Sequence, residues 1–271
     1  MSTWKKLVYL RQPYPDNYTD ISFLSQLKRN STVVKHSYWK LVQDFSLIAQ
    51  HIQCLLTVII GFSAIYHHQW DPITVSGISS AASLGIFMVW ADISRLKLVI
   101  VMIAILLVLS PVLKSLTKST ASDSIWAISF CLCIANTFFH EYALSSDVAD
   151  CRPIISTNIS FANAIVLASR LPSNISVFCF VLFAIEANIL TTLFGIHVRQ
   201  VYGLEAHKYL YMGTFLVVSC MVLTVLGSVA TLIFVGTQMG IVLGLPGYFI
   251  FLQKYKNELQ GPWDIAKLQA E

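Results

Sequence analysis

Ionisable side chains inside long apolar runs are the residues of this chain that could do chemistry. Glu186 lies near the middle of the run 174–196, and His140 and Glu141 are adjacent near the end of the run 124–144. A carboxylate at bilayer depth costs about 2.5–3.5 kcal/mol on insertion scales, so such groups normally face a bundle interior or a cavity. The sequence therefore predicts an intramembrane polar site at Glu186, Glu141 and His140. Proton relay, substrate contact and structural hydrogen bonding all stay open as its role.

The apolar runs that carry these groups exclude a water-soluble domain. Of the 271 residues, 56% are hydrophobic and only 12% are charged, whereas soluble proteins carry about 25% charged residues. A transmembrane helix needs about 20 mostly apolar residues to cross the hydrocarbon core. We therefore expect an all-α polytopic membrane protein with a bundle of about eight transmembrane helices. The eight runs are 43–66, 72–91, 97–113, 124–144, 153–171, 174–196, 208–228 and 230–252.

The last two runs are nearly continuous, and we expect a turn at Gly227-Ser228 to separate them. Pro111 and Pro246 are expected to kink or end their helices, because proline lacks the backbone N–H and clashes with the preceding turn. His197 and His207 flank the polar loop between the sixth and seventh runs, and we expect both to be solvated.

The distribution of basic residues predicts that both termini are cytoplasmic. With eight spans, 15 of the 18 Lys and Arg residues fall on the side of the termini. Only Lys114, Lys118 and Arg170 fall on the opposite side, and cytoplasmic loops are the ones enriched in Lys and Arg. The chain then divides into a basic cytoplasmic arm at 1–40, an eight-helix transmembrane bundle at 41–252 and a cytoplasmic tail at 253–271.

Two of the predicted spans carry small residues at four-residue spacing, which places them on one helix face. Such faces let helix backbones approach closely in a membrane. Packing within this bundle and packing against another subunit both remain open for them. The residues are Gly77, Ala81 and Gly85 in the second span, and Gly236, Gly240 and Gly244 in the eighth.

Motifs of nucleotide, metal and acyl-transfer chemistry are missing from the sequence. It contains no Walker motif, no glycine-rich dinucleotide fingerprint, no zinc signature and no nucleophile elbow. The parts outside the apolar runs are also too short for a nucleotide-binding α/β domain. We therefore expect no catalytic residue, no metal and no cofactor of its own.

Four segments resemble the PIG-C family, the multi-span subunit of the phosphatidylinositol N-acetylglucosaminyltransferase complex. They occur in the family's order over nearly the whole chain. They are RQPYPDNYTD at 11–20 with Trp4 upstream, SPVLKSLTKSTASDSIWA at 110–127, LASRLPS at 167–173 and GPWDIA at 261–266.

The resemblance implies a multi-pass protein of the endoplasmic reticulum membrane that takes part in the first step of glycosylphosphatidylinositol (GPI) anchor biosynthesis. In that step GlcNAc is transferred from UDP-GlcNAc to phosphatidylinositol. The implied role is a non-catalytic scaffold that can present the lipid substrate. The implied partners are a separate catalytic glycosyltransferase subunit, other membrane subunits of the complex, phosphatidylinositol and membrane lipids.

The resemblance also directs attention to the arm, at the cytoplasmic membrane surface. Basic residues there can attract an anionic phosphoinositide headgroup. We expect a lipid-headgroup or partner contact made by Lys5, Lys6, Arg11, Tyr14, Pro15, Asp16, Asn17 and Tyr18.

Two other functions remain open from the residues alone. A small-solute or lipid transporter predicts a central cavity lined by Glu186, Glu141 and the fifth-span residues Asn158 and Asn163. A membrane transferase acting alone predicts His140 and Glu141 as its acid–base groups. Internal repeats, which transporters often have, are not visible in the sequence.

Overall fold

The computed structural model describes residues 11–15, 18, 28–30, 36–90, 93–116, 120–142, 154–257 and 259–260. The chain forms two compact units. One contains Met1–Tyr38 together with Gly247–Glu271, and the other is Trp39–Pro246. The candidate site lies entirely in the second unit.

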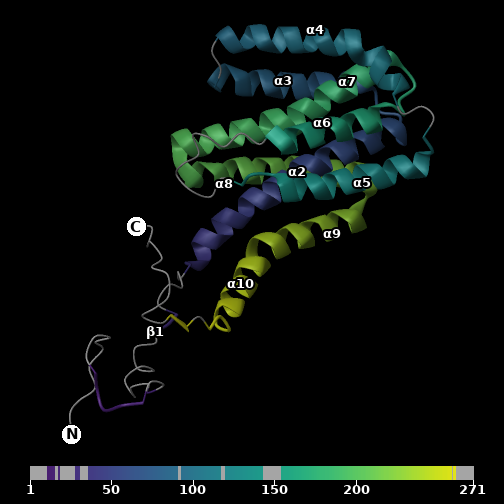
Figure 1. Cartoon of the computed structure of the whole chain (residues 1–271). Coiled ribbons are helices and arrows are strands. Elements are labelled where there is room, and N and C mark those ends of the chain that lie inside the picture. The colour runs from purple at the N-terminus through teal and green to yellow at the C-terminus, as the bar shows by residue number, and fades with distance from the viewer. Residues whose placement is uncertain are drawn as a thin grey trace. The chain divides into compact units, whose positions relative to one another are not determined.

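Helices make up nearly all of the described structure (Figure 1). The expected all-α class is therefore confirmed. In chain order the helices are α2 (Tyr38–Tyr66), α3 (Pro72–Trp90), α4 (Ile93–Ser115), α5 (Ser122–Phe139), α6 (Ile154–Ala168), α7 (Asn174–Ile185), the π-helical turn η2 (Glu186–Leu190), α8 (Thr191–Leu226), α9 (Ser228–Met239), the π-helical turn η3 (Gly240–Gly244) and α10 (Leu245–Gln253).

Among the described residues, four helical stretches are long and apolar enough to cross a membrane. They are Tyr38–Tyr66, Ser122–Phe139, Asn174–Leu226 and Ser228–Gln253. Three shorter apolar helices accompany them at Pro72–Phe87, Val99–Ser115 and Ile154–Ala168. The membrane class follows from these helices, while the count of eight spans and the cytoplasmic termini stay predictions.

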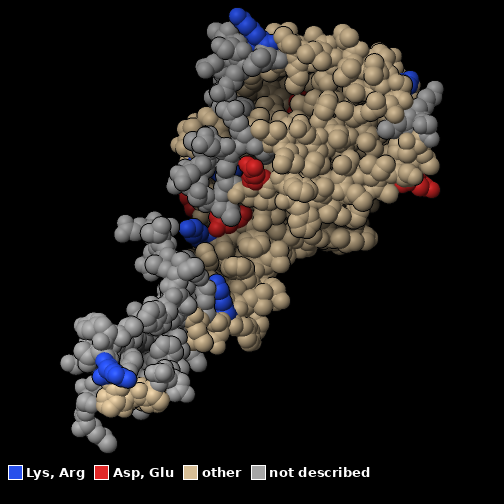
Figure 2. Space-filling model, viewed as in Figure 1, with Lys and Arg blue, Asp and Glu red and all other residues tan. Residues whose placement is uncertain are grey.

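The surface of the second unit is mostly apolar, as expected for a protein in a lipid bilayer. Tan side chains cover most of the face seen in Figure 2, and charged ones are few over its helices. Large apolar residues point outward, including Val108 at 79% exposure and Phe138 at 82%. In water, proteins with such a surface would aggregate. In a bilayer the same side chains contact lipid tails, which are also apolar.

Two glycines interrupt the long helical stretch in the second half of the chain. Gly227 has φ 86° and separates α8 from α9, which confirms the predicted turn. Gly203 has φ 79° and breaks α8 internally. Both conformations are accessible to glycine without a Cβ penalty. The loop expected between 196 and 208 is instead helical on either side of Gly203.

The two helix-internal prolines are accommodated differently. Pro246 follows η3, where the N–H of Leu245 bonds the carbonyl of Gly240 five residues earlier. A π-helical turn of this kind accommodates a proline, because it changes the hydrogen-bond register ahead of it. Pro111 lies inside α4, which ends one turn later at Ser115.

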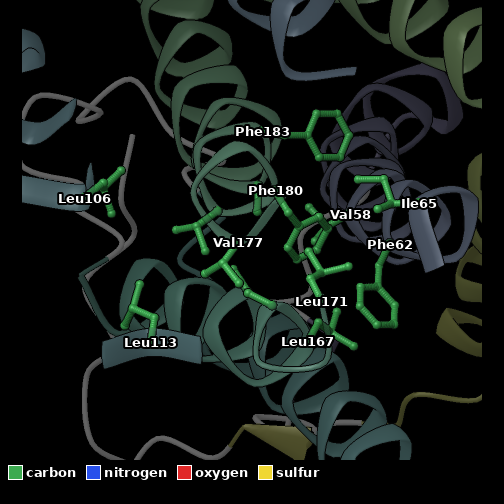
Figure 3. Close-up of a cluster of buried hydrophobic side chains, with 14 of the residues drawn as sticks. Val58, Phe62, Ile65, Leu106, Leu113, Leu167, Leu171, Val177, Phe180 and Phe183 are labelled. Carbon is green, nitrogen blue, oxygen red and sulfur yellow. The ribbon is translucent and has the colours of Figure 1, made fainter. Parts of the chain in front are cut away.

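The main hydrophobic cluster joins α2, α4, α5, α6 and α7 (Figure 3). Phe62 of α2 lies edge-on to Phe180 of α7, with ring centroids 5.5 Å apart. Gly61 makes this approach close, because a Cβ there would lie 2.4 Å from the ring of Phe183. The central helix α2 is thereby held with two thirds of its apolar stretch buried.

In the first unit, a two-residue strand pair joins the arm to the tail. Lys28–Arg29 (β1) pairs antiparallel with Leu259–Gln260 (β2). The sequence did not predict this pairing, because two-residue strands have no detectable alternation.

Candidate functional site

A pocket in the second unit is lined by polar side chains from three separate parts of the chain. Helix α2 supplies one side, the segment after α5 supplies a second, and the first part of α8 together with His207 supplies the third. Its lining residues are Leu47, Gln50, His51, Cys54, His140, Tyr142, Thr192, Gly195, Arg199 and His207.

Two stacked imidazole rings form the centre of this site. The ring of His51 lies 3.9 Å from that of His140, centroid to centroid, with an angle of 16° between their planes. Tyr142 meets the ring of His140 edge-on at 4.7 Å. His51 is 6% exposed and His207 only 2%. The expectation that His207 is solvated is therefore wrong: the helix resumes after Gly203 and turns this residue inward.

A chain of hydrogen bonds holds His140 in place. Its Nδ1 lies 2.9 Å from the hydroxyl of Ser156 on α6. That hydroxyl donates to the side-chain carbonyl of Asn136 on α5, and the Asn136 amide donates to Ser160 at 2.6 Å. Because Asn136 is almost fully buried, this network fixes α5 against α6 and positions the imidazole between them and α2.

A second, smaller pocket adjoins the first and shares His51, His140 and Thr192 with it. Asn188 lies in it, on the π-helical turn η2. The two spaces measure about 20 Å³ and about 10 Å³. A cavity needs roughly 10–15 Å³ to hold one water molecule. The site can therefore enclose an oxygen-sized group, whereas a sugar ring or a nucleotide does not fit.

Several buried polar atoms at this site have no hydrogen-bond partner among the described residues. Asn188 is 4% exposed and leaves both its amide nitrogen and its oxygen unpaired, and Gln50, at 6%, leaves its amide nitrogen unpaired. An unpaired buried polar group costs about 1–3 kcal/mol. Such a site gains free energy when a ligand or water supplies the missing partners.

Of the three residues predicted to form the intramembrane site, only His140 lines the pocket. Glu186 begins η2 and faces α3, where Ser79 and Ser80 donate hydroxyl hydrogen bonds to it, the second at 2.8 Å. Glu141 is exposed. The structure thus separates the two carboxylates from the histidine pair.

The small-residue faces do not mediate close packing among the described helices. A Cβ at Gly77, Gly85, Gly236, Gly240 or Gly244 would meet no described atom within 4 Å. Both interpretations of these faces, packing within the bundle and packing against another subunit, stay predictions.

The predicted arm contacts lie in part outside the described residues, which exclude Lys5, Lys6, Asp16 and Asn17. Of the others, Tyr14 and Tyr18 have ring centroids 4.5 Å apart. The N–H of Tyr18 donates to the carbonyl of Pro15 at 2.9 Å, which closes a turn.

Sequence reasoning missed most of the pocket. His51, Gln50 and Arg199 were not singled out, and the one available signal was local. Gln50 and His51 interrupt an otherwise apolar run in the first span, and an internal polar residue of this kind normally faces a partner or a cavity.

Comparison with known proteins gives a family match over almost the entire chain. Residues 4–264 match the GPI2 family model, described as phosphatidylinositol N-acetylglucosaminyltransferase. The Schizosaccharomyces pombe phosphatidylinositol N-acetylglucosaminyltransferase GPI2 subunit is 34% identical over 97% of this chain and 86% of its own length. A putative subunit of the same transferase from Dictyostelium discoideum is 35% identical over 98% and 79%.

A human subunit of the same transferase is 28% identical over 99% of this chain and 94% of its own length. No solved structure gives a significant match to the chain.

Proposed function

We propose, from the premise that this chain belongs to the GPI2 family of phosphatidylinositol N-acetylglucosaminyltransferase proteins, that it is a membrane subunit of the complex that makes GlcNAc-phosphatidylinositol. Its role there is non-catalytic: it scaffolds the complex and presents the lipid substrate. The observation that carries the proposal is the match over residues 4–264, since the matching relatives are named as subunits of that transferase.

The geometry of the pocket supports a non-catalytic role. A glycosyltransferase must bind a nucleotide sugar, and the polar pocket encloses only about 20 Å³. A separate catalytic glycosyltransferase subunit would then supply that site. The other partners that we propose are further membrane subunits of the complex and phosphatidylinositol itself.

The apolar helices and the family support a location in the endoplasmic reticulum membrane, with the chain crossing it several times. We keep two proposals for contacts in that setting. The residues of the arm, including Lys5, Lys6 and Arg11, contact the lipid headgroup or a partner, and the open glycine faces of α3 and α9–η3 contact neighbouring subunits.

The geometry of the two pockets does not support the alternative function of a transporter. It predicted a central cavity lined by Glu186 and Glu141, and neither residue lines the two polar pockets. Asn158 is not among the lining residues either. A transferase acting alone is likewise not favoured, because Glu141 is exposed while His140 is held by Ser156.

The test is transfer of labelled GlcNAc from UDP-GlcNAc to phosphatidylinositol in microsomes depleted of this protein. We expect transfer to be lost and to return when the full chain is expressed again. Undiminished transfer in the depleted microsomes would overturn the proposal.

A second arm of the experiment examines the N-terminal contact. Re-expression of a chain in which Lys5, Lys6 and Arg11 are each replaced by Glu is expected to restore transfer only in part, because reversed charges repel the anionic headgroup. A matched control replaces Lys254, Lys256 and Lys267 of the tail by Glu. Equal, full rescue by both chains would overturn the arm contact alone.

A further inference from the structure

The unpaired donors of the polar pocket point toward a bound acceptor. The amide nitrogens of Gln50 and Asn188 are buried without a partner among the described residues. Gln50 of α2 lines the larger space and Asn188 of η2 lines the smaller one, and both spaces border His51 and His140. A ligand rich in acceptor oxygens would satisfy both.

The charge of the lining residues selects an anion. Arg199 borders the larger space, and the described residues that line the two pockets include no Asp or Glu. Arginine stays protonated in proteins and matches the geometry of phosphate oxygens.

The position of the pocket along the helices suits a lipid headgroup. His51 lies near the middle of the 29-residue helix α2, which is roughly 43 Å long and so exceeds a hydrocarbon core of about 30 Å. Arg199 and His207 each lie four residues from the break at Gly203, or roughly 6 Å along the axis. The apolar stretch Asn174–Leu226 has 53 residues, enough to cross the core twice with a break between the crossings. With the break at Gly203, Arg199 and His207 lie toward one membrane surface, where phospholipid phosphates lie.

We propose that this pocket binds a phosphate oxygen of an anionic phospholipid headgroup, with Arg199, Gln50 and the histidines as donors. The small volume admits one oxygen-sized group, so the rest of the headgroup lies outside. This inference rests on the proposed function and deepens it, because it assigns lipid presentation to this pocket. A free phosphate ester shares the chemistry, and the experiment distinguishes the two sources.

The decisive variant is Gly195→Ala, which fills the pocket with one methyl group. A Cβ at Gly195 would lie 3.7 Å from the Gln50 side-chain oxygen and 3.6 Å from Leu210, which are ordinary contacts, so the helix tolerates it. Gly213→Ala is the matched control, since Gly213 is also in α8 and a Cβ there meets no described atom within 4 Å. Arg199→Gln removes the charge without filling the space.

The measurement is native mass spectrometry of the full-length protein, titrated separately with phosphatidylinositol, phosphatidylcholine and inorganic phosphate. We expect phosphatidylinositol to bind more tightly than phosphatidylcholine. Because a hydrogen bond to a charged group contributes about 1.5–3 kcal/mol, Gly195→Ala and Arg199→Gln should each weaken phosphatidylinositol binding by about tenfold or more. Gly213→Ala should bind as the parent chain does.

Equal phosphatidylinositol affinity in all four proteins would overturn the proposal, as would equal affinity for the two lipids. Binding of inorganic phosphate as tight as that of phosphatidylinositol would overturn the lipid as the source of the anion. If the lipid-binding proposal fails, the proposed function is not affected, because a scaffold that does not bind lipid in this pocket would still restore GlcNAc transfer in depleted microsomes. Conversely, suppose that Gly195→Ala loses lipid binding while depleted microsomes transfer GlcNAc undiminished. That result would overturn the proposed membership of the transferase complex and would support the lipid-binding pocket.

Discussion

Two polar clusters meet on the same stretch of α2, and they differ in whether their hydrogen bonds are complete. Gln53 donates to Gln238 of α9 at 3.1 Å and accepts from Thr214 of α8 at 2.7 Å. Three residues earlier, Gln50 leaves its amide nitrogen unpaired beside the stacked rings of His51 and His140. Both glutamines are buried.

The difference separates a structural role from a binding role. A closed cluster ties helices together, because every buried polar group has exchanged its water for a protein partner. Here that cluster joins α2 to both α8 and α9, with Tyr211 as a further donor to Gln238 at 3.4 Å. In an open cluster the unpaired buried groups lower the stability of the folded protein. A bound ligand that pairs them raises the stability again. Stability and ligand binding should therefore respond oppositely in the two places.

The largest effect is expected from breaking the closed cluster at one residue. Gln53→Leu removes the shorter of the two hydrogen bonds to the buried side-chain oxygen of Gln238 and keeps the 3.4 Å bond from Tyr211, and we expect a loss of about 1–3 kcal/mol in the free energy of unfolding. The double variant Gln53→Leu with Gln238→Leu should recover part of that loss, because neither polar group is then stranded. Thermal unfolding of the full chain in lipid nanodiscs measures both. A double variant less stable than either single one would contradict the closed-cluster account.

A smaller change in the free energy of unfolding, of opposite sign, is expected for Gln50, three residues before Gln53. Gln50→Leu removes a buried donor that has no partner among the described residues, so stability should be unchanged or raised by up to about 1 kcal/mol. Phosphatidylinositol binding should weaken, because a donor of the pocket is gone. The same unfolding and lipid-titration measurements apply. A destabilisation as large as that of Gln53→Leu would show that Gln50 is structural after all.

The helical membrane class could be predicted because it is a local property of the chain. Runs of about 20 apolar residues are sufficient to indicate helices in a bilayer, where every backbone group must be paired internally. The turn at Gly227 followed in the same way, since a helix over both last runs would be longer than the membrane is thick. The helix on either side of Gly203 was missed, because the polar residues around this glycine are typical of a loop.

The pocket could not be predicted, because it is assembled from distant parts of the chain. His140 stood out beside Glu141, but its partner His51 lies almost ninety positions earlier. Glu186 attracted attention as a carboxylate in an apolar run, yet two serine hydroxyls of α3 satisfy it. Asn188, two residues further along η2, is the residue that this turn directs to the pocket. Which side of a helix faces a cavity depends on neighbours that the sequence does not reveal.

The smallest effect is expected at Asp71, a paired carboxylate on the exposed surface before α3, which contrasts with both buried clusters. The hydroxyl of Thr74 donates to it at 2.7 Å, and the backbone N–H groups of Thr74 and Ile73 also donate. These bonds, the Thr74 hydroxyl first, hold the pKa of Asp71 below its ordinary value. A lowered pKa means that the stabilisation is complete above the ordinary value of about 3.9 and is lost as pH falls through the lowered one.

We therefore expect the first turn of α3 to lose hydrogen-exchange protection modestly between pH 5 and pH 3, after correction for intrinsic exchange rates. Asp71→Asn is the matched control, because asparagine also caps a helix start but carries no titrating proton. Its protection should not change with pH in that range. The same loss in both proteins would assign the acid sensitivity to other groups. Protection near Gln53 should stay constant throughout, because its amide partners do not titrate, and this separates a neutral buried network from a charged exposed cap.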